Sequence, residues 1–180
     1  MSSLKLDTGM VVLGQRSIQA LREALNRDIA PQAATILQEV GYASGAQVWA
    51  VFEAWLHQDG VTDPGELDAG VLSEALSEFF TALGWGQMTL ERVGNAGLAI
   101  DAPSWGEAQL GGGAQYPSCY LTAGLFSDFM ARLSGQGVQV METECRSRGD
   151  ARCRFLVATP ETIQKAYDAM VAGQDYTAAI

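Results

Sequence analysis

Two cysteines that flank a short polar turn near the end of the chain constrain its fold more than any other feature. The stretch CRSRGDARC begins with Cys145 and ends with Cys153, and its Arg-Gly-Asp centre is typical of a tight hairpin turn. Antiparallel pairing of the flanking strands would bring the two thiols close together. The sequence therefore predicts a β-hairpin between Glu142 and Phe155, with two sulfur atoms at its closed end.

Further candidate metal ligands lie near the same turn. The remaining cysteine, Cys119, stands upstream in YPSCY at the expected start of a helix, and Glu142 precedes Cys145 by three residues. Three thiolates and one carboxylate can form a tetrahedral shell, and zinc is the metal that most readily accepts it. A helix N-terminus also favours a thiolate through its dipole. The candidate ligands of a structural zinc ion, which would clamp a helix to the hairpin, are Cys119, Glu142, Cys145 and Cys153.

Spacing alone leaves alternatives open. Cys145 and Cys153 could form a hairpin disulfide, or they could be ordinary buried thiols beside a solvated Glu142. An odd number of cysteines argues against a disulfide framework in a chain that we expect to be cytoplasmic. Glu144 competes for the carboxylate position. Glu142 and Cys145 differ in strand parity, so they can share a metal only if the strand bends where it enters the turn.

The basic residues of the chain gather at the same turn. Arg146, Arg148, Arg152 and Arg154 bracket the two cysteines. One interpretation is a solvated hairpin tip. The other is that these charges stabilise thiolates and neutralise an anionic metal site. The two interpretations are compatible.

The composition indicates a globular chain that does not bind nucleic acid. Hydrophobic residues make up 48% of 180 residues, which fits a single domain over residues 1–180 with a loose N-terminal segment over residues 1–15. The formal net charge of −10 argues against a nucleic-acid surface, because phosphate binding needs clustered Lys and Arg. No apolar run approaches the ~20 residues of a membrane span. The start MSSLKLDTG has no basic stretch followed by an apolar one, so we expect a cytoplasmic protein.

A single histidine limits the catalytic chemistry available to the chain. His57 alone cannot supply the paired histidines of a His-Glu-x-x-His protease, and it leaves few routes to a Ser-His or Cys-His nucleophile. The glycine run LGGGAQ lacks the Lys-Ser/Thr of a phosphate-binding loop, and no Gly-x-Gly-x-x-Gly fingerprint for a nicotinamide or flavin is present. The sequence therefore does not predict an enzyme.

Apolar periodicity predicts an α+β domain. Strand-like runs separated by turn signals fall at residues 88–93, 98–102, 138–145 and 153–159. Helical spacing falls at residues 17–26, from Pro31 to about residue 56 as one helix or a pair, at 67–83, at 118–133 and from Pro160 onward. This order predicts an antiparallel sheet of about four strands flanked by helices.

One interruption of the helical pattern has its own interpretation. The segment GYASG, residues 41–45, breaks the long apolar pattern that follows Pro31. It predicts a kink or a close crossing of two helices, because glycine removes the Cβ that would keep the backbones apart. Close approach of the backbone to a ligand is the alternative.

The candidate ligands form part of a longer pattern. The spacing Cys-x22-Glu-x2-Cys-x7-Cys joins them with Gly124, Val140, Gly149 and Phe155. This pattern resembles the vinyl-4-reductase domain family, which includes the sensory domains of phenol- and xylene-responsive bacterial transcription activators. The resemblance is strongest over residues 116–157, and the GYASG and LGWG segments extend it to most of the chain.

The resemblance implies a fold, a cofactor and a kind of ligand. In the family, a structural zinc ion sits beside a hydrophobic pocket, and the spacing assigns the zinc ligands to Cys119, Glu142, Cys145 and Cys153. The fold is related to the small subunits of the TRAPP vesicle-tethering complex, which implies a homodimer. A pocket between the sheet and the helices would be lined by nearby aromatic residues, although core packing is the alternative for each: Trp85, Trp105, Tyr116, Tyr120 and Phe126.

On that basis the expected function is binding. The chain is similar to a stand-alone sensor or carrier domain for a hydrophobic or aromatic small molecule. Alternatives are an assembly module like the TRAPP subunits, or an auxiliary protein of tetrapyrrole or bacteriochlorophyll synthesis. The sequence shows no ATPase module and no helix-turn-helix signature, so we do not expect a complete activator. His57, Trp85 and Trp105 cannot be matched to the His and Trp with which the phenol sensors read their ligand, so phenol itself is not implied.

Overall fold

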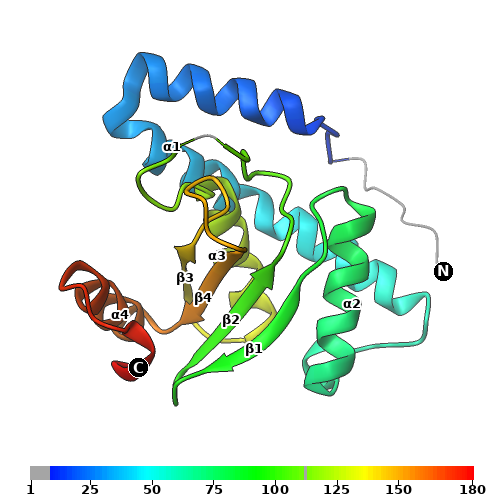
Figure 1. Cartoon of the computed structure of the whole chain (residues 1–180). Helices are drawn as coiled ribbons and strands as arrows, with labels where there is room; N and C mark the ends of the chain where they lie inside the picture. The colour runs from blue at the N-terminus through cyan, green and yellow to red at the C-terminus, as the bar shows by residue number, and fades with distance from the viewer. Residues whose placement is uncertain (1–8, 112) are drawn as a thin grey trace.

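The computed structural model describes residues 9–111 and 113–180 and shows an α+β fold (Figure 1). Its centre is a four-stranded antiparallel sheet in the order β1-β2-β4-β3. The predicted fold class is therefore confirmed. The strands are β1 (Thr89–Val93), β2 (Gly97–Ala102), β3 (Gln139–Glu144) and β4 (Cys153–Ala158). The helices are α1 (Gln15–His57), η1 (Pro64–Glu66), α2 (Ala69–Ala82), α3 (Tyr120–Ser134), α4 (Pro160–Val171) and η2 (Tyr176–Ala178).

Two hairpins supply the strands. The GNAG segment closes the first, where Val93 pairs with Gly97 and Gly94 adopts a positive φ of 58°. The second is the cysteine hairpin of β3 and β4. Pairing of β2 with β4 joins the two hairpins, so β4 is internal and β3 forms one edge. Cys153, the first residue after the turn of the cysteine hairpin, therefore enters the middle of the sheet.

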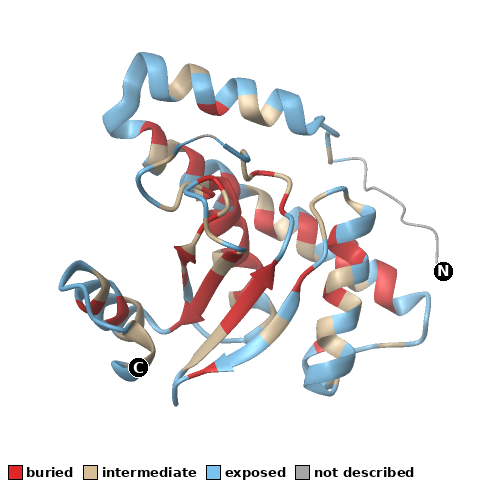
Figure 2. Cartoon of the chain, viewed as in Figure 1, coloured by how far each residue is buried: buried red, intermediate tan, exposed pale blue. Residues whose placement is uncertain are grey.

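Alternating side chains cover the two faces of the sheet. Phe155 and Val157 of β4 face a large core beneath α3 and the second half of α1. Leu156, between them, faces a smaller core formed with Ala166 of α4. Figure 2 shows the buried residues concentrated in the central strands and in α3. This period-two pattern fixes the register, because a slip by one residue would exchange the two faces.

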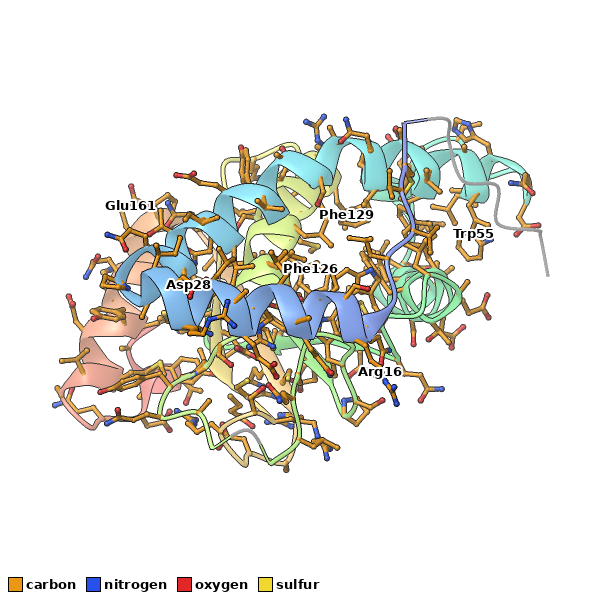
Figure 3. The ribbon with its side chains drawn as sticks, turned by 90° about the horizontal axis from the view of Figure 1, so that it is seen from above. Arg16, Asp28, Trp55, Phe126, Phe129 and Glu161 are labelled. Atoms are coloured by element: carbon orange, nitrogen blue, oxygen red, sulfur yellow. The ribbon has the colours of Figure 1, made fainter. Side chains whose placement is uncertain are left out.

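Helix α1 consists of two parts with a break between them. Ile29 has non-helical backbone angles (φ −143°, ψ 42°), two residues before Pro31. Proline has no N–H for the helical hydrogen bond, and its ring clashes with the preceding turn, so it breaks the helix here. Residues 15–28, which we call the arm, point in roughly the opposite direction to residues 30–57; Arg16 and Asp28 mark the ends of the arm (Figure 3).

The GYASG segment is a close helix crossing, and the helix continues through it. A Cβ on Gly41 would overlap the backbone carbonyl of Leu121 in α3. A Cβ on Gly124 of α3 would overlap the carbonyl of Gln38 in the same way. The crossing interpretation is therefore confirmed, and the break in α1 lies earlier, at Ile29. Glycine on both helices brings α3 close to α1 and sets the position of its N-terminus.

The predicted domain boundaries stay a prediction. Of the loose segment expected over residues 1–15, residues 1–8 lie outside the described residues, and residues 9–14 precede α1 without forming a helix or strand. Within residues 9–111 and 113–180, no helix combines the length and the apolar character that crossing a bilayer requires.

Candidate metal centre and neighbouring cavities

Three elements carry the candidate ligands. Cys119 is the N-cap residue of α3, Cys145 directly follows the last residue of β3, and Cys153 is the first residue of β4. All three thiols are buried and free, so the structure has no disulfide among these fully described cysteines. The hairpin brings Cys145 and Cys153 together, and α3 adds Cys119 from above the sheet.

Glu142 reaches the cysteines because β3 is irregular near its end. Glu142 pairs with Phe155, whereas Glu144 pairs with the adjacent Arg154, which leaves Thr143 as an extra residue in the strand. A bulge of this kind bends the strand and redirects the residues that follow it. The sequence required such a bend for Glu142 and Cys145 to share a centre, and this irregularity supplies it.

The spacing of the sulfur atoms fits a common ion. One ligand atom from each of the four residues lies within 4.8 Å of all the others. Cys119 Sγ is 3.8 Å from Cys145 Sγ and 4.0 Å from Cys153 Sγ. A tetrahedron with zinc–sulfur bonds of about 2.3 Å has edges of about 3.8 Å, whereas a disulfide bond is about 2.05 Å long. The geometry therefore fits three sulfur ligands of one tetrahedral metal ion.

The two oxygens of Glu142 have different roles. Oε2 accepts a hydrogen bond of 2.8 Å from the backbone N–H of Cys119. Oε1 is buried and has no hydrogen-bond partner among the described residues. A buried carboxylate oxygen without a partner is costly unless a cation occupies the position next to it. The competing carboxylate, Glu144, instead pairs with Arg152 at 3.1 Å.

Mutual electrostatics of the four groups favour a cation among them. Hydrogen bonds to the thiols of Cys119 and then Cys153 lower the pKa of Cys145. Contacts with Cys145 and then Cys153, followed by burial, raise the pKa of Cys119. Burial, followed by the negative charge of Cys145, raises the pKa of Glu142 to about 8. A shared positive charge would allow all four groups to ionise together, as metal ligation requires.

The four arginines around the turn form hydrogen bonds and ion pairs with the turn itself and with neighbouring segments. Only Arg148 of the four is exposed, and the Arg154 side chain is 11% exposed, so the four arginines form a paired and partly buried cluster rather than a solvated tip. Each contacts a carboxylate or a backbone carbonyl: Arg146 contacts Pro103 O, Arg148 contacts Asp150, Arg152 contacts Glu144 and Arg154 contacts Asp101.

Two acidic residues near the site have roles that sequence reasoning did not assign, although Asp150 was placed in the predicted turn. Asp150 closes the turn: its Oδ2 accepts from the backbone N–H of Cys145 at 2.7 Å, and its own N–H donates to the Cys145 carbonyl at 3.2 Å. An Asp in a Gly-containing turn is a recognisable signal for this role. Glu107 is fully buried and contacts the N-terminus of α3. Its partners lie 14, 15 and 85 residues away, so no local signal could identify it.

The five aromatic residues predicted to line a pocket lie in several environments. Trp105 and Phe126 are buried in the core, with ring centroids 5.5 Å apart; Phe126 lies in the interior beneath α1 (Figure 3). Tyr116 is 66% exposed. Tyr120 lines a groove beside Cys119 and Glu142. Trp85 lines an apolar cavity and stacks on Trp105.

That apolar cavity, which we call the arm cavity, has a volume of about 330 Å³. It lies between the arm, the second half of α1, the end of α2 and the start of α3. Among its described lining residues none is charged, and most are aliphatic. Representative lining residues are Val12 and Ile18 on the arm side, Val40 and Val48 on α1, Trp85 after α2, and Leu121 and Leu125 on α3.

The chain is similar to known proteins in sequence pattern and in fold. The family model of the vinyl-4-reductase domain matches residues 107–159, which include all four candidate ligands. This match confirms the resemblance that the cysteine spacing predicted. No curated protein sequence matches the chain.

Two of the solved structures that match the chain show this shared fold. The phenol-responsive sensory domain of the transcription activator PoxR, solved with phenol, has a TM-score of 0.65 and 18% identity, covering 91% of this chain and 82% of that one. A trafficking protein particle complex subunit 3 from Naegleria fowleri, covalently bound to palmitic acid, has a TM-score of 0.61 and 13% identity, covering 80% and 91%. At these identities the likeness shows the fold alone, and the predicted TRAPP-like fold is confirmed.

Proposed function

We propose that this chain is a zinc-stabilised domain that binds an uncharged hydrophobic or aromatic small molecule and acts as a sensor or carrier. The arm cavity is the observation that carries this proposal. Its volume of about 330 Å³ lies within the range of small-molecule sites, roughly 300–1,000 Å³. Such a volume suits a ligand of one or two rings or a short acyl chain.

The chemistry of the cavity favours an uncharged ligand. Ser44 and Gln15 are polar lining residues, and both already contact backbone carbonyls: Ser44 Oγ donates to Gly41 O at 2.6 Å, and Gln15 Nε2 donates to Gly84 O at 3.0 Å. A charged ligand would lose its hydration without gaining an opposite charge. Trp85 supplies an aromatic ring to the lining.

The metal ion would have a structural role. The residues that would hold it are Cys119, Glu142, Cys145 and Cys153, and their spacing and the partnerless oxygen of Glu142 support zinc. A shell of four protein ligands leaves no open coordination position, which is typical of structural rather than catalytic zinc. When bound, zinc would supply a cross-link between α3 and the cysteine hairpin.

The comparisons support a sensory role. The match to the vinyl-4-reductase domain covers the metal-site region, and a structure with the same fold is a phenol-responsive sensory domain. A ligand in the arm cavity would favour the closed position of the arm, and such a shift of populations is what a partner protein reads. We also propose that the domain forms a homodimer, as in the resembled family.

Two measurements on the purified protein test the proposal. Elemental analysis is expected to find about one zinc ion per chain. Thermal unfolding with phenols and short fatty alcohols is expected to show stabilisation by at least one of these uncharged classes, whereas stabilisation by a porphyrin alone would favour the tetrapyrrole alternative. A ligand at 100 times its Kd adds about 2.7 kcal/mol to stability. Absence of stabilisation by every class would overturn the binding function.

A matched pair of variants locates the ligand. Val40 lines the arm cavity and is 49% exposed, whereas Val71 on α2 is 51% exposed and does not line it. Val40→Trp would fill the cavity and remove most of the ligand-dependent stabilisation, and Val71→Trp would leave it intact. Equal loss in both variants would place the ligand elsewhere. In native mass spectrometry, a co-purified lipid that does not exchange with added ligand would instead favour an assembly module.

A further inference from the structure

The arm is attached to the domain mainly through a buried arginine. Among the described residues 15–28, Arg22 alone is buried, while Leu21 beside it is 42% exposed. Burial of a guanidinium is costly unless it is paired and hydrogen-bonded. Weaker contacts flank Arg22: Gln15 Nε2 donates to Gly84 O, and Glu23 Oε1 accepts from Gln109 Nε2. An arm held largely by polar contacts can separate from the domain with less loss of apolar burial than an ordinary core helix.

Arg22 contacts two segments that flank the N-terminus of α3. One Nη donates to the backbone carbonyl of Glu107, and Nε lies 3.8 Å from Glu107 Oε1. The other Nη donates to both the carbonyl and the hydroxyl of Ser118, at 2.9 and 3.0 Å. Arg22 therefore links the arm to the residue that immediately precedes the candidate ligand Cys119.

Glu107 performs the capping of α3 that Cys119 does not. Cys119 is the N-cap residue, but its side chain makes no capping hydrogen bond. Glu107 is fully buried and accepts from the backbone N–H groups of Leu121 and Thr122, at 3.1 and 2.8 Å, and from the Thr122 hydroxyl at 2.6 Å. A carboxylate at this position satisfies unpaired N–H groups and complements the helix dipole. The sulfur of Cys119 is thereby left available for a metal.

A single peptide unit joins the arm to the metal centre. The amide between Ser118 and Cys119 has its carbonyl held by Arg22 and its N–H held by Glu142 Oε2. The arm also supplies Ile18 to the arm cavity, and α3 supplies Leu121 on the opposite wall. Movement of the arm away from the cavity would therefore release one side of the peptide that positions Cys119.

We propose that Arg22 and Glu107 form a latch through which closure of the arm over its cavity and metal binding at Cys119 favour each other. Both residues are positioning residues, because they act through the Ser118–Cys119 peptide and the α3 N-terminus. The latch rests on the proposed function for its cavity and its zinc ion. Coupling of this kind is reciprocal and typically corresponds to a change of about 5–150-fold in affinity.

The test uses zinc-loaded protein and a variant that removes both charges of the latch. Removal of Arg22 alone would leave Glu107 buried without its cation and could unfold the domain. The double variant Arg22→Met with Glu107→Gln avoids an unpaired charge. Two quantities are measured: the rate of zinc release to excess chelator, and hydrogen exchange of the amides in residues 15–28.

Two controls separate the latch from general effects. Arg27→Met removes an arginine from the same arm that pairs only at the surface with Asp28, where their side chains are 71% and 60% exposed. Leu76→Ala removes a buried core side chain of α2, an element separate from the arm, and lowers stability. Neither is expected to change zinc release or arm exchange by more than about twofold under native conditions.

The double variant is expected to release zinc at least about fivefold faster and to exchange the arm amides faster by a similar factor. Faster arm exchange with unchanged zinc release would overturn the coupling while leaving the proposed function intact. Wild-type protein that binds no zinc would instead overturn the metal part of the proposed function, and the coupling with it. Faster zinc release in Leu76→Ala by the same factor would also overturn the latch.

Discussion

The candidate metal centre draws its ligands from the stretch between Cys119 and Cys153, whereas the arm cavity takes its walls from segments spread between Met10 and Leu125. The four candidate ligands are at most 7% exposed. On the arm side of the cavity, by contrast, Val11 and Val12 are 83% and 75% exposed. One region is a closed cluster within the core, and the other is an apolar hollow with an open edge.

This difference suggests a division of labour between stability and response. A metal ion bound in this buried cluster would cross-link the three elements that carry its four ligands. The cluster would therefore resist opening. A cavity covered by an arm with little apolar burial can open at low cost, as ligand-binding elements generally do. Substitutions in the metal centre should therefore change folding, and substitutions in the cavity wall should change ligand binding with little effect on folding.

The largest effect is expected from loss of a sulfur ligand. Cys145→Ser would abolish stoichiometric zinc and lower the free energy of unfolding by more than about 4 kcal/mol, because structural zinc sites contribute folding energy directly. Chemical denaturation and elemental analysis measure both quantities. Ala151→Ser, at an exposed position of the same turn, is the control and should leave both unchanged. If Cys145→Ser binds no zinc but keeps the wild-type free energy of unfolding, zinc does not stabilise the fold by cross-linking α3 to the hairpin.

A smaller effect is expected at the crossing of α1 and α3, which supports both regions. A Cβ on Gly124 would meet the backbone of Gln38 and Tyr42, which cannot move aside as a side chain does. Gly124→Ala should therefore lower the free energy of unfolding by about 2–3 kcal/mol. Gly137→Ala, where no atom lies within 4 Å of the new Cβ, provides the control for thermal and chemical denaturation. Equal stability of the two variants would contradict the tight crossing.

The carboxylate ligand should matter less than the sulfur ligands. Glu142→Gln keeps an oxygen that can accept from the Cys119 N–H but replaces the charged ligand with a neutral amide. Zinc affinity, measured by competition with a chelator, is expected to fall by roughly tenfold or more, or about 1.4 kcal/mol. Glu144→Gln, two residues away and paired with Arg152, should leave the affinity within about twofold. A larger loss of zinc affinity in Glu144→Gln than in Glu142→Gln would indicate that Glu144 is the ligand.

The cluster of Cys119, Glu142, Cys145 and Cys153 could be predicted from the sequence because three of its members lie on one hairpin and Cys119 is the only other thiol. Cys145 and Cys153 stand on a hairpin whose turn is readable, and the parity of Glu142 correctly required a bend, which the bulge at Thr143 supplies. The strands and most helices followed from apolar periodicity. The break in α1 was foreseeable at Pro31, but the direction of the arm was not, because contacts far along the chain decide it.

The arm cavity and the latch could not be predicted because their contacts are distant in sequence. Arg22 meets Ser118 across 96 residues, and Glu107 resembles any surface glutamate until its burial is known. The predicted pocket aromatics illustrate the same limit. Trp105 and Phe126 are of a residue type that often lines pockets, but both pack into the core. Aliphatic residues before and within the arm line the cavity.

The smallest effect on folding, and the sharpest test of the division between the regions, is expected at Val12. Its side chain lines the arm cavity but is 75% exposed. Val12→Ser should therefore change the free energy of unfolding by less than about 0.5 kcal/mol. Affinity for an apolar ligand should fall about threefold or more, since each buried CH₂ contributes about 0.8 kcal/mol. Titration calorimetry measures the affinity.

Val171→Ser, 69% exposed on α4 and outside the cavity lining, is the control. Loss of zinc or of stability in Val12→Ser would mean that the cavity wall is part of the folding core, and the two regions would then not be separable.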